Sequence, residues 1–129
     1  MLKENRIKPQ LNIFREIISP CSTSPVTGFF RDSCCNTDVS DVGSHTVCAE
    51  MTKEFLSYSK SKGNDLSTPR PEFGFEGLKP GNSWCLCASR WLQAEKDGHA
   101  PMVFGHCTNY LALSVIPKNI LQKYLITVN

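Results

Sequence analysis

The segment Trp84-Cys-Leu-Cys-Ala-Ser-Arg-Trp-Leu-Gln-Ala-Glu-Lys-Asp-Gly98 decides the fold class, because its pattern changes along its length. Residues 84–88 form a short apolar run, which predicts a buried strand. Ser89 then provides an N-cap for a short helix that carries Trp91 and ends at Gly98. A strand followed at once by a helix indicates a domain of mixed α and β structure.

Two more elements are predicted immediately upstream of this segment. Residues 45–49, His-Thr-Val-Cys-Ala, are β-branched in part and bounded by turn formers, which favours a strand. Thr52 is a plausible N-cap for a helix whose apolar pattern stops at Gly63. Nearer the N-terminus, residues 11–18 are predicted to form another strand of mixed apolar residues.

The C-terminal part completes the predicted architecture. Residues 102–104 and 111–115 are predicted as two further strands, and Pro117 occupies the first turn of a terminal helix. We therefore expect a single α+β domain over residues 11–129, with a small and mostly antiparallel sheet, two or three helices and long ordered loops.

The longest predicted loop lies between the two central strands, over residues 64–81. It holds three prolines and three glycines, which exclude a helix. Phe73, Phe75 and Leu78 recur between these residues, so the loop is predicted to be pinned by apolar anchors. Ordered loops of this length are usually functional.

Composition places limits on the function. The chain has 129 residues, of which 40% are hydrophobic and 20% are charged, as in one globular domain. A formal net charge of +2 is too small to indicate a basic surface that binds nucleic acid. Residues 1–10 are predicted to form a flexible basic leader that lacks the apolar core of a secretion signal, and no run is long enough to span a membrane. These features predict a cytoplasmic location.

The seven cysteines are the strongest chemical signal. Cys85 and Cys87 are two apart in a predicted strand and can face a common site, whereas adjacent Cys34 and Cys35 point apart. One of the latter pair, together with Cys48, would complete four ligands for a tetrahedral metal site. Zinc is the first candidate, with iron or copper as alternatives.

His45 precedes Cys48 by three residues, and its imidazole is a further potential metal ligand or general base. A histidine that is only hydrogen-bonded is the simpler alternative. The chain contains no phosphate-binding loop, no Ser-His-Asp arrangement and no paired-histidine metalloprotease motif, so the sequence assigns no enzymatic activity.

Two other interpretations of the cysteines remain open. The protein is a thiol redox protein if Cys85 with Cys87, or Cys34 with Cys35, exchanges electrons. Alternatively, the cysteines are small apolar residues of the core. A disulfide framework is not expected, because the predicted compartment is reducing and an odd number of cysteines leaves one unpaired.

A third hypothesis concerns a polar loop that precedes the proline-rich stretch. Its side chains offer an amide, a carboxylate, two hydroxyls and a guanidinium, on residues Asn64, Asp65, Ser67, Thr68 and Arg70. A fork-shaped guanidinium beside a rigid Pro-x-Pro frame can hold a carboxylate or a phosphate. The same polar residues also satisfy their own backbone in turns, so a structural role is the alternative.

Several strings of the chain are distinctive when taken together. They are Pro20–Thr23, Thr27–Asp32, Cys34–Thr37, Asp41–Ala49, Gly63–Phe75, Gly77–Gly81 and Trp84–Trp91. Over about Leu11 to Tyr124 the chain resembles the bacterial domain-of-unknown-function family two-two-three-seven. It departs from the family pattern in its basic leader, at Ser33 and in the turn Asn82-Ser83. The resemblance implies a compact, soluble, single-domain protein and brings no established activity with it.

Overall fold

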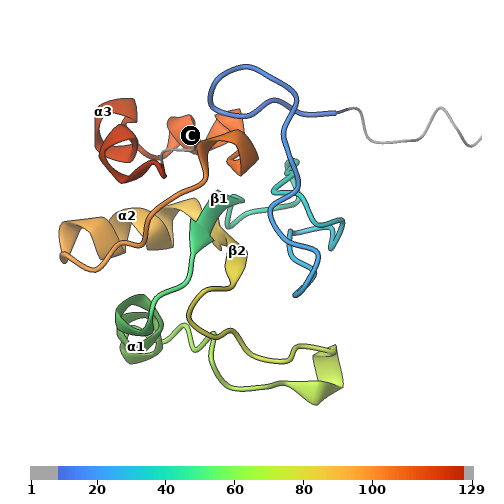
Figure 1. Ribbon diagram of the computed structural model, residues 1–129, viewed down its shortest axis with the longest axis vertical. Coiled ribbons are helices and arrows are strands. Elements are labelled where there is room, and N and C mark those ends of the chain that lie inside the picture. The colour runs from blue at the N-terminus through green and yellow to red at the C-terminus, as the bar shows by residue number, and fades with distance from the viewer. Residues whose placement is uncertain (1–8, 127–129) are drawn as a thin grey trace, which may run out of the picture.

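The computed structural model describes residues 9–126 and has a two-stranded antiparallel sheet at its centre (Figure 1). Strand β1 comprises His45–Glu50, and strand β2 comprises Ser83–Cys87. Both strands coincide closely with the predicted ones. They come from segments far apart in the chain, so the intervening helix and loop must cross from one strand to the other.

The register of this pairing sorts the side chains onto two faces. Cys48 lies opposite Cys85, and Val47 lies opposite Leu86. Successive side chains of a strand point to opposite faces, so the two cysteines share one face and the two aliphatic residues share the other. A register shift follows at the end of the pairing, between His45 and Val47.

The described residues contain three α-helices and four short 3₁₀ helices. The α-helices are α1 (Lys53–Ser61), α2 (Ala88–Lys96) and α3 (Lys118–Leu121). The 3₁₀ helices are η2 (Pro71–Phe73), η3 (Gly105–Cys107), η4 (Tyr110–Ser114) and η5 (Gln122–Tyr124). The predicted class, a small α+β fold, is confirmed.

Two helices begin close to the predicted positions, for different reasons. At α1 the prediction is confirmed, because Thr52 Oγ1 accepts a hydrogen bond of 2.9 Å from the amide of Phe55. Helix α2 begins two residues earlier than expected. Cys87 is its N-cap residue without a capping side-chain bond, and Ser89 already lies inside the helix. Strand β2 therefore passes into α2 with no loop between them.

The predicted strand over residues 11–18 is wrong. Asn12 Oδ1 accepts hydrogen bonds from the amides of Phe14 at 2.8 Å and Glu16 at 3.1 Å, which fold the segment into a turn. A single bridge between Leu11 and Ile17 is the only strand-like pairing within that segment. The local side-chain bonds outweigh its apolar pattern.

The two predicted C-terminal strands are also wrong. Within residues 102–104 only Val103 forms isolated bridges, to Ala49 and Leu125. Residues 111–115 lie mostly in η4, because Asn109 Oδ1 accepts a hydrogen bond of 2.9 Å from the amide of Leu111 and starts a helical turn.

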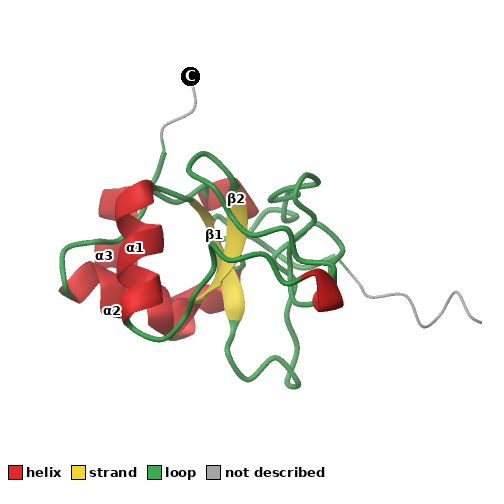
Figure 2. Ribbon diagram, turned by 90° about the horizontal axis from the view of Figure 1, so that it is seen from below, coloured by secondary structure: helices red, strands yellow, loops and turns green. Residues whose placement is uncertain are grey.

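The main core lies between the sheet and the helices. Figure 2 shows α1, α2 and α3 gathered on one side of the two strands, with most of the loops on the other side. Phe55 of α1 and Trp91 of α2 are buried on the helical side, and the Trp91 indole donates a hydrogen bond of 3.1 Å to Pro101 O. A smaller buried cluster of Ile18, Cys35, Cys48 and Cys85 occupies the loop side.

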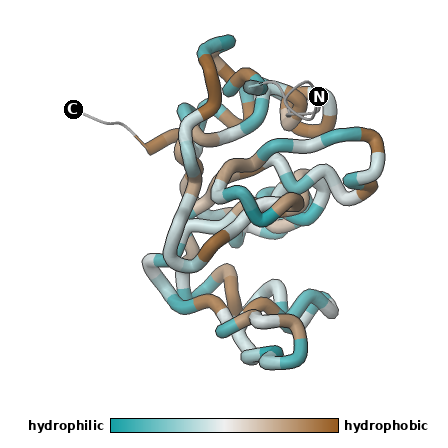
Figure 3. Tube along the Cα trace, turned by 90° about the vertical axis from the view of Figure 1, so that its right-hand side faces the viewer, coloured by the Kyte–Doolittle hydropathy of each residue, from teal (hydrophilic) through white to brown (hydrophobic). Residues whose placement is uncertain are grey.

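The long loop over residues 64–81 is anchored in part as predicted. Its trace carries hydrophilic and hydrophobic residues side by side (Figure 3). Leu78 is buried, and Phe75 packs at 5.5 Å from the ring of Trp84. Phe73 is no anchor, because 79% of its surface is exposed. The loop is therefore pinned at its second half and presents a free aromatic ring at its tip.

Of the predicted basic leader, residues 1–8 lie outside the described residues. No helix within residues 9–126 combines the length and the apolar character that a membrane span requires.

Candidate functional site

The cysteines meet on the loop side of the sheet as two disulfides. Cys21 bonds to Cys48 across a sequence separation of 27, and Cys35 bonds to Cys85 across a separation of 50. The strands supply Cys48 and Cys85 as direct neighbours, and the loop that precedes β1 supplies their partners. Each disulfide therefore fastens this loop to a different strand.

The two disulfides adjoin each other. The sulfur atoms of Cys21, Cys35 and Cys85 all lie within 4.8 Å of one another. The fourth sulfur, of Cys48, is bonded to the Cys21 sulfur. Four sulfur atoms from two strands and one loop thus form a single group, which we call the cysteine cluster.

Hydroxyl groups fix the backbone beneath this cluster. The amide of Cys85 donates to Thr27 Oγ1 at 2.9 Å, and the amide of Cys48 donates to Thr108 Oγ1 at 3.1 Å. Both threonines are fully buried. Alternate amides of an antiparallel strand point away from its partner strand, and here the two threonine hydroxyls satisfy them.

Solvent reaches the two disulfides unequally. Cys35 and Cys48 are fully buried and Cys85 is 2% exposed, whereas Cys21 is half-buried. Of the four cluster residues, Cys21 is therefore the one that is partly exposed to solvent. The Cys21–Cys48 bond is the outer disulfide of the cluster, and Cys35–Cys85 is the inner one.

The described residues also include three free cysteines, Cys34, Cys87 and Cys107. Burial raises the pKa of the Cys107 thiol, and the neighbouring Cys34 raises it further. Burial and the charge of Asp32 raise the pKa of Cys34 in the same way. Both thiols are thus protonated at neutral pH, which makes them weak nucleophiles. Cys87 Sγ lies 3.2 Å from Ser89 Oγ at the start of α2.

The structure brings together only some of the residues that the sequence suggested as metal ligands. Cys35, Cys48 and Cys85 meet in the cluster, whereas Cys34, Cys87 and His45 are outside the group of atoms within 4.8 Å. Cys87 diverges from Cys85 because the strand ends there and the helix begins.

Sequence reasoning missed Cys21 and did not expect disulfides. The expectation of no disulfide framework is wrong for this structure, because the strand register places Cys48 and Cys85 side by side beneath a cysteine-bearing loop. Cys21 follows Pro20 in a stretch dense with turn formers. A rigid loop is a reason to expect a fixed position, yet the sequence gives no spacing signal for its partner.

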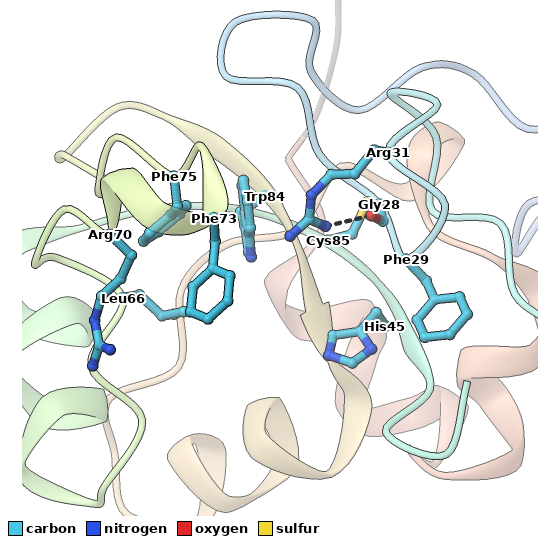
Figure 4. Close-up of a pocket in the computed structure, with 10 residues that line it drawn as sticks. All are labelled: Gly28, Phe29, Arg31, His45, Leu66, Arg70, Phe73, Phe75, Trp84 and Cys85. Atoms are coloured by element: carbon cyan, nitrogen blue, oxygen red, sulfur yellow. Dashed lines mark hydrogen bonds between the residues drawn. The ribbon is translucent and has the colours of Figure 1, made fainter. Parts of the chain in front are cut away.

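A cavity of about 470 Å³ opens beside the inner disulfide (Figure 4). It lies over β2, between the loop before β1 and the loop before β2. Its lining residues are Gly28, Phe29, Arg31, His45, Leu66, Arg70, Phe73, Phe75, Trp84 and Cys85. Cys85 is the residue that this cavity shares with the cysteine cluster.

Asp41 orients His45 at one end of the cavity. His45 Nδ1 lies 2.7 Å from Asp41 Oδ1, and the His45 amide donates to Asp41 Oδ2 at 2.8 Å. Burial by itself would raise the pKa of the Asp41 carboxyl, but the hydrogen bonds from His45 and Thr37 outweigh it and hold this pKa below its ordinary value. The buried carboxylate thus fixes the imidazole, as a catalytic or binding histidine requires.

Arg31 is held over the floor of the cavity. Its guanidinium lies 5.3 Å from the centre of the Trp84 ring and donates to Gly28 O at 2.5 Å. Gly28 adopts a φ of +101°, and a Cβ there would lie 2.3 Å from Cys34 O. Only glycine fits at this position, so the turn that presents Arg31 depends on it.

The predicted polar loop divides into a structural part and a part at the cavity. Asp65 accepts hydrogen bonds from the amides of Ser67 and Thr68 and from Thr68 Oγ1, and these bonds lower the pKa of its carboxyl. Asn64 O accepts a bond from Ser59. Arg70, by contrast, lines the cavity. Asp65 and Thr68 thus use their side chains within the turn, and Asn64 and Ser67 take part through backbone groups. Arg70 is the member of the set that lines the cavity.

Fold and site together define a small α+β domain whose loop side is fastened by a disulfide-linked cysteine cluster beside a cationic cavity. Residues 11–125 match the model of a family described as "Uncharacterized protein conserved in bacteria (DUF2237)". The chain belongs to this family, which confirms the resemblance found in the sequence. No curated protein matches the chain. The family brings no activity, so the function has to be argued from the site.

Proposed function

We propose that this protein is a thiol–disulfide redox protein that passes electrons from its outer to its inner disulfide. One observation carries the proposal: half-buried Cys21 has its sulfur within 4.8 Å of both sulfurs of the buried Cys35–Cys85 bond. Thiol–disulfide exchange needs a thiolate close to a disulfide sulfur, and the cluster supplies that arrangement once Cys21 is released.

The exchange begins with a dithiol reductant from solution. Its first thiolate attacks Cys21 Sγ, the Cys21–Cys48 bond breaks, and Cys48 leaves as a thiolate that takes up a proton. The second thiolate of the reductant attacks the mixed disulfide and leaves as the oxidised, cyclic disulfide, which releases Cys21 as a thiolate. Two electrons have then entered the outer pair.

The second step moves these electrons inward. The Cys21 thiolate attacks one sulfur of Cys35–Cys85, that bond breaks, and the displaced cysteine leaves as a thiolate and takes up a proton. Cys21 is then joined to a strand or loop cysteine of the former inner pair. A second dithiol attacks Cys21 Sγ, and the inner cysteine leaves as a thiolate and takes up a proton. The second thiolate of that dithiol then displaces Cys21, the dithiol leaves as a cyclic disulfide, and both pairs are reduced. The buried disulfide is thus reduced without direct contact with the solvent.

This proposal changes the redox pairs suggested by the sequence. Cys34–Cys35 and Cys85–Cys87 are replaced by Cys21–Cys48 and Cys35–Cys85, because those are the sulfurs that adjoin. Cys34 and Cys107 keep protonated thiols beside the cluster, since burial raises the pKa of both.

The test is the order in which the disulfides open. The intact protein is treated with dithiothreitol without oxygen, quenched with an alkylating agent at intervals, and mapped by mass spectrometry. We expect alkylation of Cys21 and Cys48 first. In Cys21→Ser/Cys48→Ser, Cys35–Cys85 should open at least about 10-fold more slowly, because its relay is gone.

Cys87→Ser is the matched control, since Cys87 lies outside the cluster and should leave both the order and the rates unchanged. The proposal fails if Cys35–Cys85 opens first in the unaltered protein, or if the double variant opens it at the same rate. The order in the unaltered protein tests the idea even if the double variant folds poorly.

A second candidate function uses the reduced cluster as a metal site. Sulfurs that share a zinc ion at about 2.3 Å lie roughly 3.8 Å apart, and three of the cluster sulfurs are already within 4.8 Å of one another. Cys21, Cys35, Cys48 and Cys85 would be the ligands, with iron or copper as alternatives. Zinc and the disulfides exclude each other, because they use the same sulfurs.

Elemental analysis separates this candidate from the first. Reduced protein is mixed with zinc without oxygen and desalted. One zinc per chain is expected in the reduced protein and none in the oxidised protein, with loss of zinc in Cys21→Ser and retention in Cys87→Ser. Reduced protein that retains no zinc contradicts the metal site and leaves the redox proposal untouched.

A further inference from the structure

The cavity beside the cysteine cluster is one end of a longer groove. A second hollow of about 440 Å³ adjoins it and shares four lining residues with it. These are Arg31, Phe73, Phe75 and Trp84. The groove therefore runs over β2 between two loops, and its combined size is in the range of small-molecule sites.

The charge of the first hollow is one-sided. Arg31 and Arg70 line it, and within residues 9–126 no carboxylate belongs to its lining. The nearest pairing is weak, because Arg70 Nη1 lies 3.9 Å from Glu72 Oε2 and both side chains are more than half exposed. Arg31 donates to Gly28 O and keeps further N–H donors free. The adjoining hollow carries the carboxylate of Glu76, so the guanidinium groups favour an anionic occupant in the first hollow, whose lining holds no carboxylate of the described residues.

The apolar part of the groove favours a planar ring. Phe73 is 79% exposed, and its ring projects into the cavity between Arg70 and Arg31 (Figure 4). Phe29 is 37% exposed at the opposite side. Its ring stacks at 6.2 Å on the imidazole of His45. An exposed aromatic ring beside a guanidinium is suited to a ligand that carries both a ring and a negative charge.

The polar contacts of the cavity are held in place before any ligand arrives. Arg31 adopts a φ of +56°, in the left-handed region, and Gly28 O and the Trp84 ring fix its guanidinium. Asp41 holds His45 through Nδ1, so Nε2 has no hydrogen-bond partner among the described residues. Groups that are already oriented lose little entropy on binding.

From these observations we infer that the cavity binds a small organic anion in which a planar ring is joined to a carboxylate or a phosphate. Arg31 binds the charged group, Phe73 covers the ring, and Arg70 and His45 contact polar groups at the two ends. The inference is independent of the redox proposal, since it needs neither disulfide to open.

Binding is measured on the full chain with its disulfides intact. The probes are adenosine monophosphate, for a ring with a phosphate, and indole-3-carboxylate, for a ring with a carboxylate. Inorganic phosphate and adenosine separate the charge from the ring. Calorimetry reports the binding of each probe. We expect at least one ring-bearing anion to bind with a Kd below about 1 mM, and at least 10-fold more tightly than inorganic phosphate or adenosine.

The variants have a close matched control. Arg15 resembles Arg31 in three respects: it is exposed, it has a φ of +66°, and its guanidinium lies over an aromatic ring, that of Tyr110 at 5.4 Å. Arg31→Gln and Phe73→Ala should each weaken binding about 10-fold or more, and Arg15→Gln should leave it unchanged.

The outcomes decide the inference without ambiguity. A 10-fold loss in both cavity variants, with none in Arg15→Gln, supports it, and the tighter probe assigns the phosphate or the carboxylate. Equal weakening by Arg15→Gln, or binding of inorganic phosphate as tight as that of the tighter ring-bearing anion, overturns it. So does the failure of both ring-bearing probes to bind.

Discussion

The two faces of the β1–β2 sheet are stabilised by different means. The helical face packs Val47 and Leu86 against Trp91 and the other apolar residues of the main core. The loop face carries Cys48 and Cys85 and is covered by long loops that two disulfides fasten to the strands. One side relies on apolar burial, whereas the other relies on covalent cross-links and side-chain hydrogen bonds.

This difference between the two faces indicates which of them can carry a functional site. A face held by regular helices leaves little room for a cavity, because apolar side chains pack closely. A face built from cross-linked loops can carry irregular backbone, polar side chains and a hollow without losing its shape. Both candidate functions belong to this second face, and the cavity borders it through Gly28, Arg31 and Cys85. Trp84 and Phe75 of the cavity lining pack with the main core.

The largest expected effect comes from removing both cross-links. Loop-closure entropy predicts about 3.5 kcal/mol for the separation of 27 and about 4 kcal/mol for the separation of 50, so full reduction should lower the free energy of unfolding by roughly 7.5 kcal/mol. Denaturant unfolding with and without reductant measures this loss. On reduction, the rate of hydrogen exchange should increase more in residues 20–40 than in α2. An equal increase in both would contradict the idea that the disulfides stabilise mainly the loop face.

The next effect tests the helical face. Trp91→Ala removes a fully buried ring and its hydrogen bond to Pro101 O, which should cost about 4 kcal/mol of the free energy of unfolding. Trp91→Phe retains much of the volume and should cost about half as much. The disulfides should still form in both variants, as free-thiol titration would reveal. Scrambled disulfides would mean that the loop face depends on this core for its geometry.

A smaller effect probes the loop face at its tightest turn. Gly28→Ala places a methyl group 2.3 Å from Cys34 O at a φ of +101°, so we expect a loss of about 3 kcal/mol. Gly81→Ala is the control, since its φ of +95° is similar and no atom lies within 4 Å of the added methyl; about 1 kcal/mol is expected. Thermal unfolding compares the two, and equal losses would contradict the steric argument.

The smallest effect concerns the pH dependence of the same face. Because the pKa of Asp41 is lower in the folded protein, its contribution to stability is complete above the unfolded pKa of about 3.9 and disappears as the pH falls through the folded value. Asp41→Asn should cost about 1.5 kcal/mol at pH 7 and progressively less as the pH falls through the folded pKa of Asp41. Asp38→Asn alters an exposed carboxyl of the same loop and is the control. A pH-independent cost would refute the electrostatic explanation.

The sequence predicts the helical face better than the loop face. Local patterns suffice to predict α1, because Thr52 is a recognisable N-cap residue. They also suffice to predict the two strands, in which successive residues such as Val47 and Cys48 face opposite sides of the sheet. Those features depend on neighbours within a few residues. For the same reason the small α+β class is evident before the coordinates are known.

The loop face resists prediction because its contacts are distant or irregular. Cys21 forms a disulfide with Cys48 across a sequence separation of 27, and no spacing rule predicts such a pairing. The predicted strand at 11–18 fails because Asn12 folds its own neighbours into a turn. Arg70 was identifiable from its rigid surroundings, whereas the role of Arg31 depends on a turn that brings it over Trp84.

Because no linker separates β2 from α2, the inner disulfide and the two tryptophans lie close together along the chain. Trp84 precedes Cys85 directly in β2, and Trp91 follows within the first turns of α2. Both indoles are therefore near in sequence to the inner disulfide. We expect the intrinsic emission of the two tryptophans to differ between the oxidised and the reduced protein.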